Sequence, residues 1–244
     1  MPTHKTAKEL ARQVGDLLGD VVTFITKLFF SLNEQQLRWL GSHKRQLFNA
    51  LRSAILNLAG DVRNKELLSD WERFYKEVWG EKAVDLSNLV FPPARDDFDC
   101  FVVMLEGMTF NRILIKTKER FRSWWFGEKF DNITSPRTAD KTYIVRCRDR
   151  VEADEEHKNK SANDCKAQGL NIMTVEERMM LELFFHWKTD GHLDINTLTL
   201  TSSHNIHDGS VVGIGWDVIN NELDIGSCYS GDHYDDWCSR EVVS

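Results

Sequence analysis

The sequence has none of the short motifs that mark common metal and catalytic sites. No two of its five cysteines stand in a CxxC pair, so a zinc site built on cysteine is not indicated. There is no HExxH pair for a zinc protease, no GxSxG turn for a serine hydrolase, and no glycine-rich loop that ends in Lys-Ser or Lys-Thr. No metal, cofactor or catalytic residue is therefore predicted from a motif.

An excess of basic residues is also missing. The 31 Lys and Arg residues stand against 38 Asp and Glu, a net charge of −7, which argues against binding to nucleic acid or anionic lipid. No apolar run is long enough to cross a bilayer, because the best one, residues 21–30, is short and contains Lys27. We expect no nucleic-acid partner and no membrane span.

A secretory leader is not recognisable, because the first apolar run begins late and follows charged, helix-forming residues. The odd number of scattered cysteines is typical of reduced thiols inside a cell, although one disulfide is compatible with it. The sequence thus predicts a cytoplasmic protein and leaves export by a leaderless route open.

Aromatic residues are plentiful, since eight Trp and fourteen Phe indicate a folded chain with a substantial core. In the first 80 residues the apolar positions recur at spacings of three and four, which is typical of amphipathic helices. We expect helices over 5–32, 33–60 and 69–80, the second opened by the capping pair Asn33 and Gln36. This helical hairpin or bundle, residues 1–80, suits packing, partner binding or homo-oligomerisation.

The dipeptide Pro92-Pro93 marks a linker, residues 81–96, and the pattern changes beyond it. Residues 97–244 mix helical and extended patterns, so we predict an α+β domain there.

Within this domain, short apolar runs predict strands over 99–105 and 142–147, and a helix is expected over 109–126. The charged stretch 149–169 is expected to be solvated. A helix over 174–191 opens with the capping box of Thr174 and Glu177.

The C-terminal end predicts an antiparallel β meander, with strands over 197–202, 210–216, 222–228 and 240–244 separated by turn signals. Alternation gives the two central strands two faces. The apolar face, expected to lie on the core, holds Val212, Ile214, Trp216, Leu223 and Ile225. The small and polar face, expected to be open, holds Gly213, Gly215, Asp217, Asp224, Gly226 and Cys228.

Five residue types are rare between Thr201 and Cys238. This segment has no Lys, Gln or Met, one Glu (Glu222) and two Trp (Trp216 and Trp237). Those five types are the ones that a codon cannot encode when its first two positions are randomised and its third is a pyrimidine. Strands also disfavour Lys, Glu and Gln, so the deficit is compatible with diversified codons and with ordinary β composition.

From Asp97 onward the chain resembles the variable proteins of diversity-generating retroelements. The resemblance rests on MTVEERMMLELFFHWKTDGHLD (173–194), TLTLTSSHNIHDGSVVGIGW (197–216) and LDIGSCYSGDHYDDWCSREVVS (223–244). These stretches supply a capped helix ahead of a β-rich end, an Asp-Gly turn before a strand that ends in Trp, and a closing SREVVS similar to the family's L-R-x-R-x-V-V ending.

The resemblance implies a C-type-lectin-like fold of the formylglycine-generating-enzyme-like subclass that displays a hypervariable region. It implies a protein that binds a macromolecular or cell-surface ligand, uses no cofactor and is not an enzyme. The variable, ligand-binding surface would consist of the outward strand positions named above and of loop positions, which are Asn221, Tyr229, Asp232, Tyr234, Asp235, Asp236 and Trp237. Aromatic anchors among carboxylates favour a partner surface that bears Lys or Arg.

Two alternatives stay open at this point. A metal-dependent hydrolase could use the imidazoles and carboxylate of His204, His207, Asp208 and His233. An intracellular interaction scaffold could instead act through its N-terminal helices, with a passive C-terminal domain.

Overall fold

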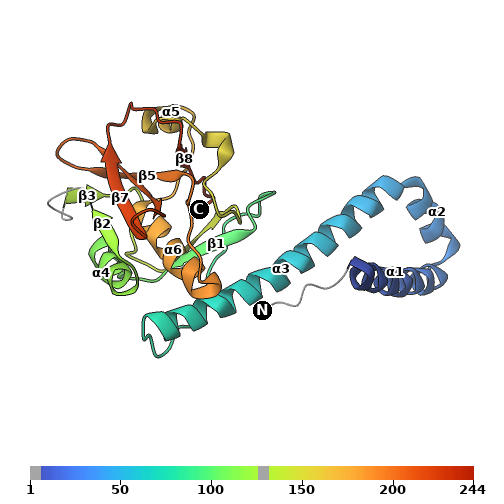
Figure 1. Cartoon of the computed structure of the whole chain (residues 1–244). Helices are drawn as coiled ribbons and strands as arrows, with labels where there is room; N and C mark the ends of the chain where they lie inside the picture. The colour runs from blue at the N-terminus through green and yellow to red at the C-terminus, as the bar shows by residue number, and fades with distance from the viewer. Residues whose placement is uncertain (1–6, 126–131) are drawn as a thin grey trace. The chain divides into compact units, whose positions relative to one another are not determined.

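The computed structural model describes residues 7–125 and 132–244, and it has a mixed α+β architecture with a curled β-sheet (Figure 1). The chain divides into two compact units, Met1–Arg63 and Asn64–Ser244. In the described residues, no helix is both long and apolar enough to cross a membrane.

The first unit contains α1 (Ala7–Phe30), α2 (Glu34–Ser42) and the first part of α3 (Lys44–Val78). The predicted capping box at the start of α2 is confirmed: the Asn33 side chain accepts from the Gln36 N–H at 2.9 Å, and the Asn33 N–H donates to the Gln36 side chain at 3.0 Å.

α3 does not stop at Gly60 or restart at Ser69, so the prediction of two separate helices there is wrong. A glycine inside a helix costs only about 1 kcal/mol relative to alanine. The last turns of α3 offset such a cost, because Trp71 and Phe74 are fully buried in the second unit. Residues 64–80, which the sequence assigned to the helical module, therefore belong to the second compact unit.

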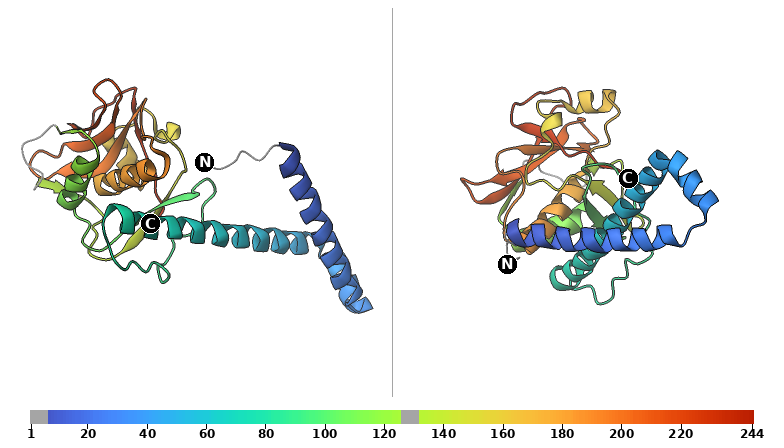
Figure 2. Two further views of the ribbon diagram at one scale, coloured as in Figure 1. Left: turned by 60° about the horizontal axis from the view of Figure 1, so that its bottom comes forward. Right: turned by 90° about the vertical axis from the view of Figure 1, so that its right-hand side faces the viewer.

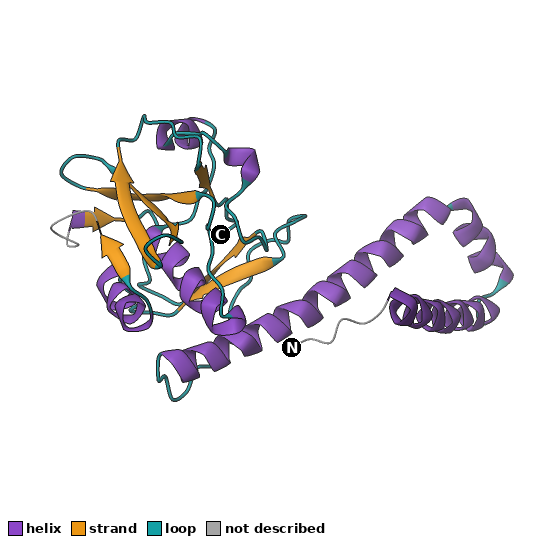
Figure 3. Ribbon diagram, in the orientation of Figure 1, coloured by secondary structure: helices purple, strands orange, loops and turns teal. Residues whose placement is uncertain are grey.

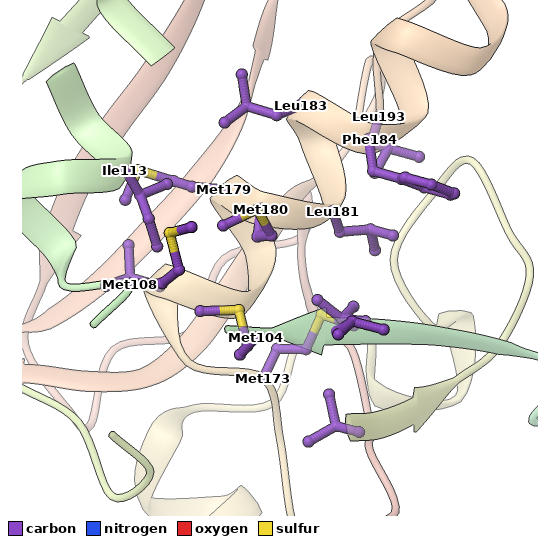
Figure 4. Packing of buried hydrophobic residues seen from close by; sticks show 14 of the residues in the cluster. Met104, Met108, Ile113, Met173, Met179, Met180, Leu181, Leu183, Phe184 and Leu193 are labelled. Carbon is purple, nitrogen blue, oxygen red and sulfur yellow. The ribbon is translucent and has the colours of Figure 1, made fainter. Parts of the chain in front are cut away.

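The core of the second unit is built around α6 (Val175–Thr189), which begins with the predicted capping box of Thr174 and Glu177. α6 contacts both the large sheet and the strand pair of β1 (Cys100–Met104) and β4 (Tyr143–Cys147) (Figure 1). Figure 4 shows Met104, Met173 and Met180 meeting there. The large sheet and the β1–β4 pair both pack on α6, and α6 is therefore buried on most sides.

The large sheet has the order β2-β7-β6-β5-β3, with β8 paired to β5 (Figure 3). Its strands are β2 (Ser123–Trp125), β3 (Ile133–Thr134), β5 (Leu198–Asn205), β6 (Val211–Asp217), β7 (Glu222–Cys228) and β8 (Trp237–Ser239). β5, β6 and β7 pair antiparallel, as predicted, and the sheet curls over α6 (Figure 2).

Three predicted elements differ from the structure. The helix expected over 109–126 is shorter, because α4 (Phe110–Arg120) ends and the chain turns into β2. The closing strand is β8, which runs parallel to β5, whereas residues 240–244 form only isolated bridges. The charged stretch 149–169 folds into a 3-10 turn (Glu155–His157) and α5 (Ala162–Ala167), and it buries several side chains.

A buried ionic network ties the C-terminal segment to this core. Arg240 donates to Asp194 at 2.6 Å, and Arg178 donates to the other oxygen of Asp194 at 2.8 Å. Burial alone would raise the pKa of Asp194, but the two guanidinium groups outweigh it and hold the pKa below its ordinary value. The chain after β8 is thereby fixed at its first residue.

Candidate functional site

The sheet formed by β6 and β7 has the two faces that alternation predicts. Val212, Ile214, Trp216, Leu223 and Ile225 are all buried in the main core, so the predicted inner face is confirmed. The opposite, outer face, where the candidate site is found, holds Val211, Gly213, Gly215 and Asp217 of β6 and Glu222, Asp224, Gly226 and Cys228 of β7.

The outer face of β6 is covered, which corrects the expectation that Gly213 and Gly215 are exposed. A Cβ on Gly213 would lie 2.7 Å from a ring carbon of Trp237, and one on Gly215 would lie 2.9 Å from the backbone oxygen of Thr197. Both glycines let a later or earlier part of the chain lie flat on the strand.

Cys228, at the end of β7, is also covered rather than open. It packs with Leu200 and Val211 in a second, small apolar cluster on the outer face, and Trp237 lies against that cluster. Burial raises the pKa of the Cys228 thiol to about 11. Cys228 therefore acts as a small apolar residue here.

Before Cys228, the outer face of β7 is more open than that of β6. Among the described residues, a Cβ on Gly226 would meet no atom within 4 Å. Asp224 lies two residues earlier on the same face, directly beside Trp124 of β2, whose side chain is 47% exposed. The β7 backbone at Asp224 and Gly226 is therefore uncovered beside the Trp124 ring.

Asp224 is the electrostatic centre of this uncovered part of β7. Its Oδ1 atom is buried and has no hydrogen-bond partner among the described residues. Burial is the main cause that raises the pKa of Asp224, and the nearby charges of Asp217 and Glu222 raise it further. An unpartnered carboxylate oxygen among like charges is a site that a cationic group would stabilise.

The loop 229–236 forms the next part of the surface and is braced by Asp232. The Asp232 carboxylate accepts from the Tyr229 N–H and from the Tyr234 hydroxyl, each at 3.2 Å. Tyr229 is 73% exposed and Tyr234 is 42% exposed, and the Tyr234 ring lies 5.0 Å from that of Trp237. Asp232 therefore holds the loop, while the tyrosines present their rings to solvent.

α5 supports this loop from its other side. The Asn163 N–H donates to the Ser230 carbonyl at 2.9 Å, and His233 Nε2 lies 2.8 Å from Asp164 Oδ2. The Asn159 N–H donates to the Trp237 carbonyl at 3.0 Å. The charged stretch before α6 is thus the platform on which the loop rests.

The turn between β6 and β7 carries the remaining predicted residues. Asp217 accepts from the backbone N–H groups of Ile219 and Asn220, and the Asn220 bonds lower the pKa of Asp217. Asn221 has φ of 52°, which suits the tight turn. Ile219 is 90% exposed at its tip.

We call the open part of this face the acidic aromatic surface. It joins strand residues to loop residues, and its members are Trp124, Asp224, Gly226, Tyr229, Tyr234, Asp235, Asp236 and Trp237. Trp124 is not predicted as a site residue from the sequence, because Ser123–Trp125 falls within the helix expected over 109–126. Two adjacent tryptophans after the charged end of a helix are typical of a strand, and this pattern could have indicated Trp124 as a strand residue.

The four residues of the hydrolase alternative do not form a ligand set. In the part of the chain that the structure describes, no group of three His, Cys, Asp or Glu residues is arranged to hold a metal ion. Asp208 instead accepts from the Ser210 N–H in a turn, and His233 is paired with Asp164. His204 lines a cleft of about 700 Å³ between β5 and α5.

Comparison of the chain with protein-family models, with curated proteins and with solved structures finds no match.

Proposed function

We propose that this chain is a ligand-binding protein that contacts a macromolecular or cell-surface target through the acidic aromatic surface. The observation that carries the proposal is the half-buried Asp224 carboxylate, whose Oδ1 atom has no hydrogen-bond partner among the described residues and whose pKa is raised by burial and by the charges of Asp217 and Glu222. Such a group costs folding free energy, and a cationic group of a partner would offset that cost. The preferred partner is therefore a protein surface that presents Lys or Arg.

The aromatic side chains supply the rest of the contact area. Trp124, Tyr229 and Tyr234 are large, partly exposed and limited to few rotamers, which makes them suitable binding anchors. The hydroxyl of Tyr234 is already held by Asp232, so this ring loses little freedom when a ligand packs on it.

We also propose that this surface is the diversified region of a retroelement variable protein, with a C-type-lectin-like domain behind an N-terminal helical module. Three features support it: the missing residue types between Thr201 and Cys238, the open side of Gly226, and the rigid inner face of β6 and β7. A fixed inner face allows outer residues to change at small cost in stability. We leave Gly213, Gly215 and Cys228 out of the proposed variable set, because they are buried.

A peptide-display experiment tests the binding proposal. Random peptides are selected on the wild-type chain, and the enriched clones are then tested on a site variant that combines Asp224→Asn, Tyr229→Ser and Asp235→Asn. A matched control variant removes two charges and one exposed apolar side chain elsewhere, with Glu106→Gln, Asp96→Asn and Val90→Ser.

Supporting results are enrichment of Lys and Arg in the clones, loss of their binding in the site variant, and retention in the control. Clones that bind both variants equally would refute the location of the site. Neutral or acidic clones that bind only at this surface would refute the cationic partner.

The retroelement proposal has a separate test in genomic DNA. A reverse transcriptase gene and a near-copy of the DNA that encodes residues 201–238, differing mainly at adenines, should lie near the coding sequence. Absence of both from a complete genome would refute the diversification and leave the binding proposal to its own experiment.

A further inference from the structure

The outward face of α1 has the pattern of a helix that pairs with another helix. Leu17, Val21, Phe24 and Leu28 follow one another at spacings of four, three and four, which is a heptad seam with Val21 and Leu28 at a and the others at d. Leu17 and Phe24 are 63% and 67% exposed, and Leu28 is 50% exposed. Within the first unit, the described residues therefore do not cover this seam.

The charge of α1 indicates what covers the seam. The helix carries three basic and three acidic residues, so it lacks the cationic face that binds an anionic membrane surface. The seam is apolar, and the positions beside it are sorted by type. The e positions are apolar, namely Ala11, Leu18 and Ile25, whereas the g positions are polar, namely Gln13, Asp20 and Lys27.

This sorting favours one orientation of a helix pair. In a parallel pair the g positions of one helix face the e positions of the other, which would place Asp20 against Ile25 and leave a charge beside an apolar side chain. In an antiparallel pair g faces g and e faces e, so polar residues meet polar residues and apolar residues meet apolar residues.

We propose that α1 binds α1 of a second copy of this chain in an antiparallel pair. The register that fits the charges sets Val21 against Phe24 and Leu17 against Leu28, each contact occurring twice by symmetry. In that register Asp20 of each copy lies within about two residues of Lys27 of the other along the helix axis, which for helices with a rise of about 1.5 Å per residue allows two ion pairs. The seam and its flanking charges are thus self-complementary.

We infer a second copy as the partner because α1 is complementary to itself. Its apolar seam, its apolar e positions and its polar g positions each meet the same kind of position on another α1. This pairing does not depend on the proposed ligand-binding function. If both hold, two binding surfaces belong to one assembly and can engage a multivalent target together.

Sedimentation velocity on the full chain over a range of concentrations tests the pairing. The wild type should show a reversible dimer, and Phe24→Glu should be monomeric at each concentration, because it places a carboxylate in the seam twice. A monomeric wild type, or a dimer that Phe24→Glu does not weaken, would overturn the proposal.

Charge exchange tests the orientation. Asp20→Lys and Lys27→Asp should each weaken the dimer about tenfold, because each replaces two attractions by two repulsions, and the double exchange should return to within about threefold of the wild type. Asp16→Lys makes the same charge change away from the seam and serves as the control, with less than about a twofold effect expected.

Far-UV circular dichroism of all variants verifies that α1 remains helical. Single exchanges without effect, or a double exchange that fails to recover, would refute the antiparallel register.

Discussion

β6 and β7 are neighbouring strands of one sheet with the same alternation, yet their outer faces differ. On β6, Gly213 lies beneath the Trp237 ring and Gly215 beneath the backbone at Thr197. On β7, a Cβ on Gly226 would meet no atom of the described residues within 4 Å, and the Asp224 Oδ1 atom has no hydrogen-bond partner among them. Alternation decides which side of a sheet a residue faces, whereas segments distant in sequence decide whether that side is open.

The largest effect should come from filling the covered side at Gly215. Gly215→Ala would place a methyl group 2.9 Å from a backbone oxygen, which cannot rotate away. We expect a loss of about 2–3 kcal/mol in the free energy of unfolding, typical of an overpacked interior. Urea denaturation measures it, and a loss below about 1 kcal/mol would show that the cover at Thr197 moves easily.

Gly213→Ala should cost less, about 1–2 kcal/mol, because the atom it meets belongs to a side chain that can shift. The Trp237 ring should move, so the variant should also change the binding surface. A double-mutant cycle with Trp237→Ala measures the coupling. Additive effects of the two substitutions would show that the ring does not rest on this glycine.

These two glycines also mark the limit of what the sequence could predict. The inner face was predictable, because Val212, Ile214 and Trp216 alternate with small residues and period two is a local property. The cover on the outer face was not, because Trp237 reaches Gly213 only when β8 pairs parallel with β5. No local pattern encodes that pairing.

Helix ends show the same division. The capping boxes at Asn33 and Thr174 were predicted correctly, because a cap needs only residues three apart. The sequence predicts a helix end at Gly60, yet α3 continues to Val78, because the burial of Trp71 outweighs the weak helix-breaking effect of one glycine. Tertiary packing therefore determines where α3 ends, because the helix-breaking effect of a glycine is only about 1 kcal/mol.

On the open side, Asp224→Asn should stabilise the protein by less than about 1 kcal/mol at pH 7, because it removes a half-buried charge near Asp217 and Glu222 whose effect solvent partly screens. The raised pKa fixes the sign of the pH dependence. Between pH 3.8 and the folded-state pKa, the folded protein binds more protons than the unfolded chain, so the Asp224 contribution falls as pH rises through that window.

The stability gain of Asp224→Asn should therefore be present at pH 7 and absent at pH 3.5, as denaturation at both values would show. The same variant should weaken binding of cationic peptides. A substitution that raises stability and lowers affinity identifies a residue retained for binding. A variant that is less stable at pH 7 would instead give Asp224 a structural role.

The smallest effect should come from Gly226. Gly226→Ser adds a side chain where no atom lies within 4 Å, and the free energy of unfolding should change by less than about 0.5 kcal/mol. Measured beside Gly215→Ala, it compares glycines on the outer faces of adjacent strands. Equal losses at the two positions would remove the distinction between the covered and the open strand.

The hydrogen bonds of Arg240 anchor the chain after the loop 229–236, so the length of this loop can vary as well as its sequence. With β7 paired before the loop 229–236, and β8 and Arg240 anchored after it, the two ends of the loop are fixed independently of the residues between them. For such a closed span, doubling the number of residues costs only about 0.6 kcal/mol of chain entropy. Insertions at the tip of this loop should therefore be tolerated, and loops of different lengths can connect β7 and β8 without a change in the rest of the fold.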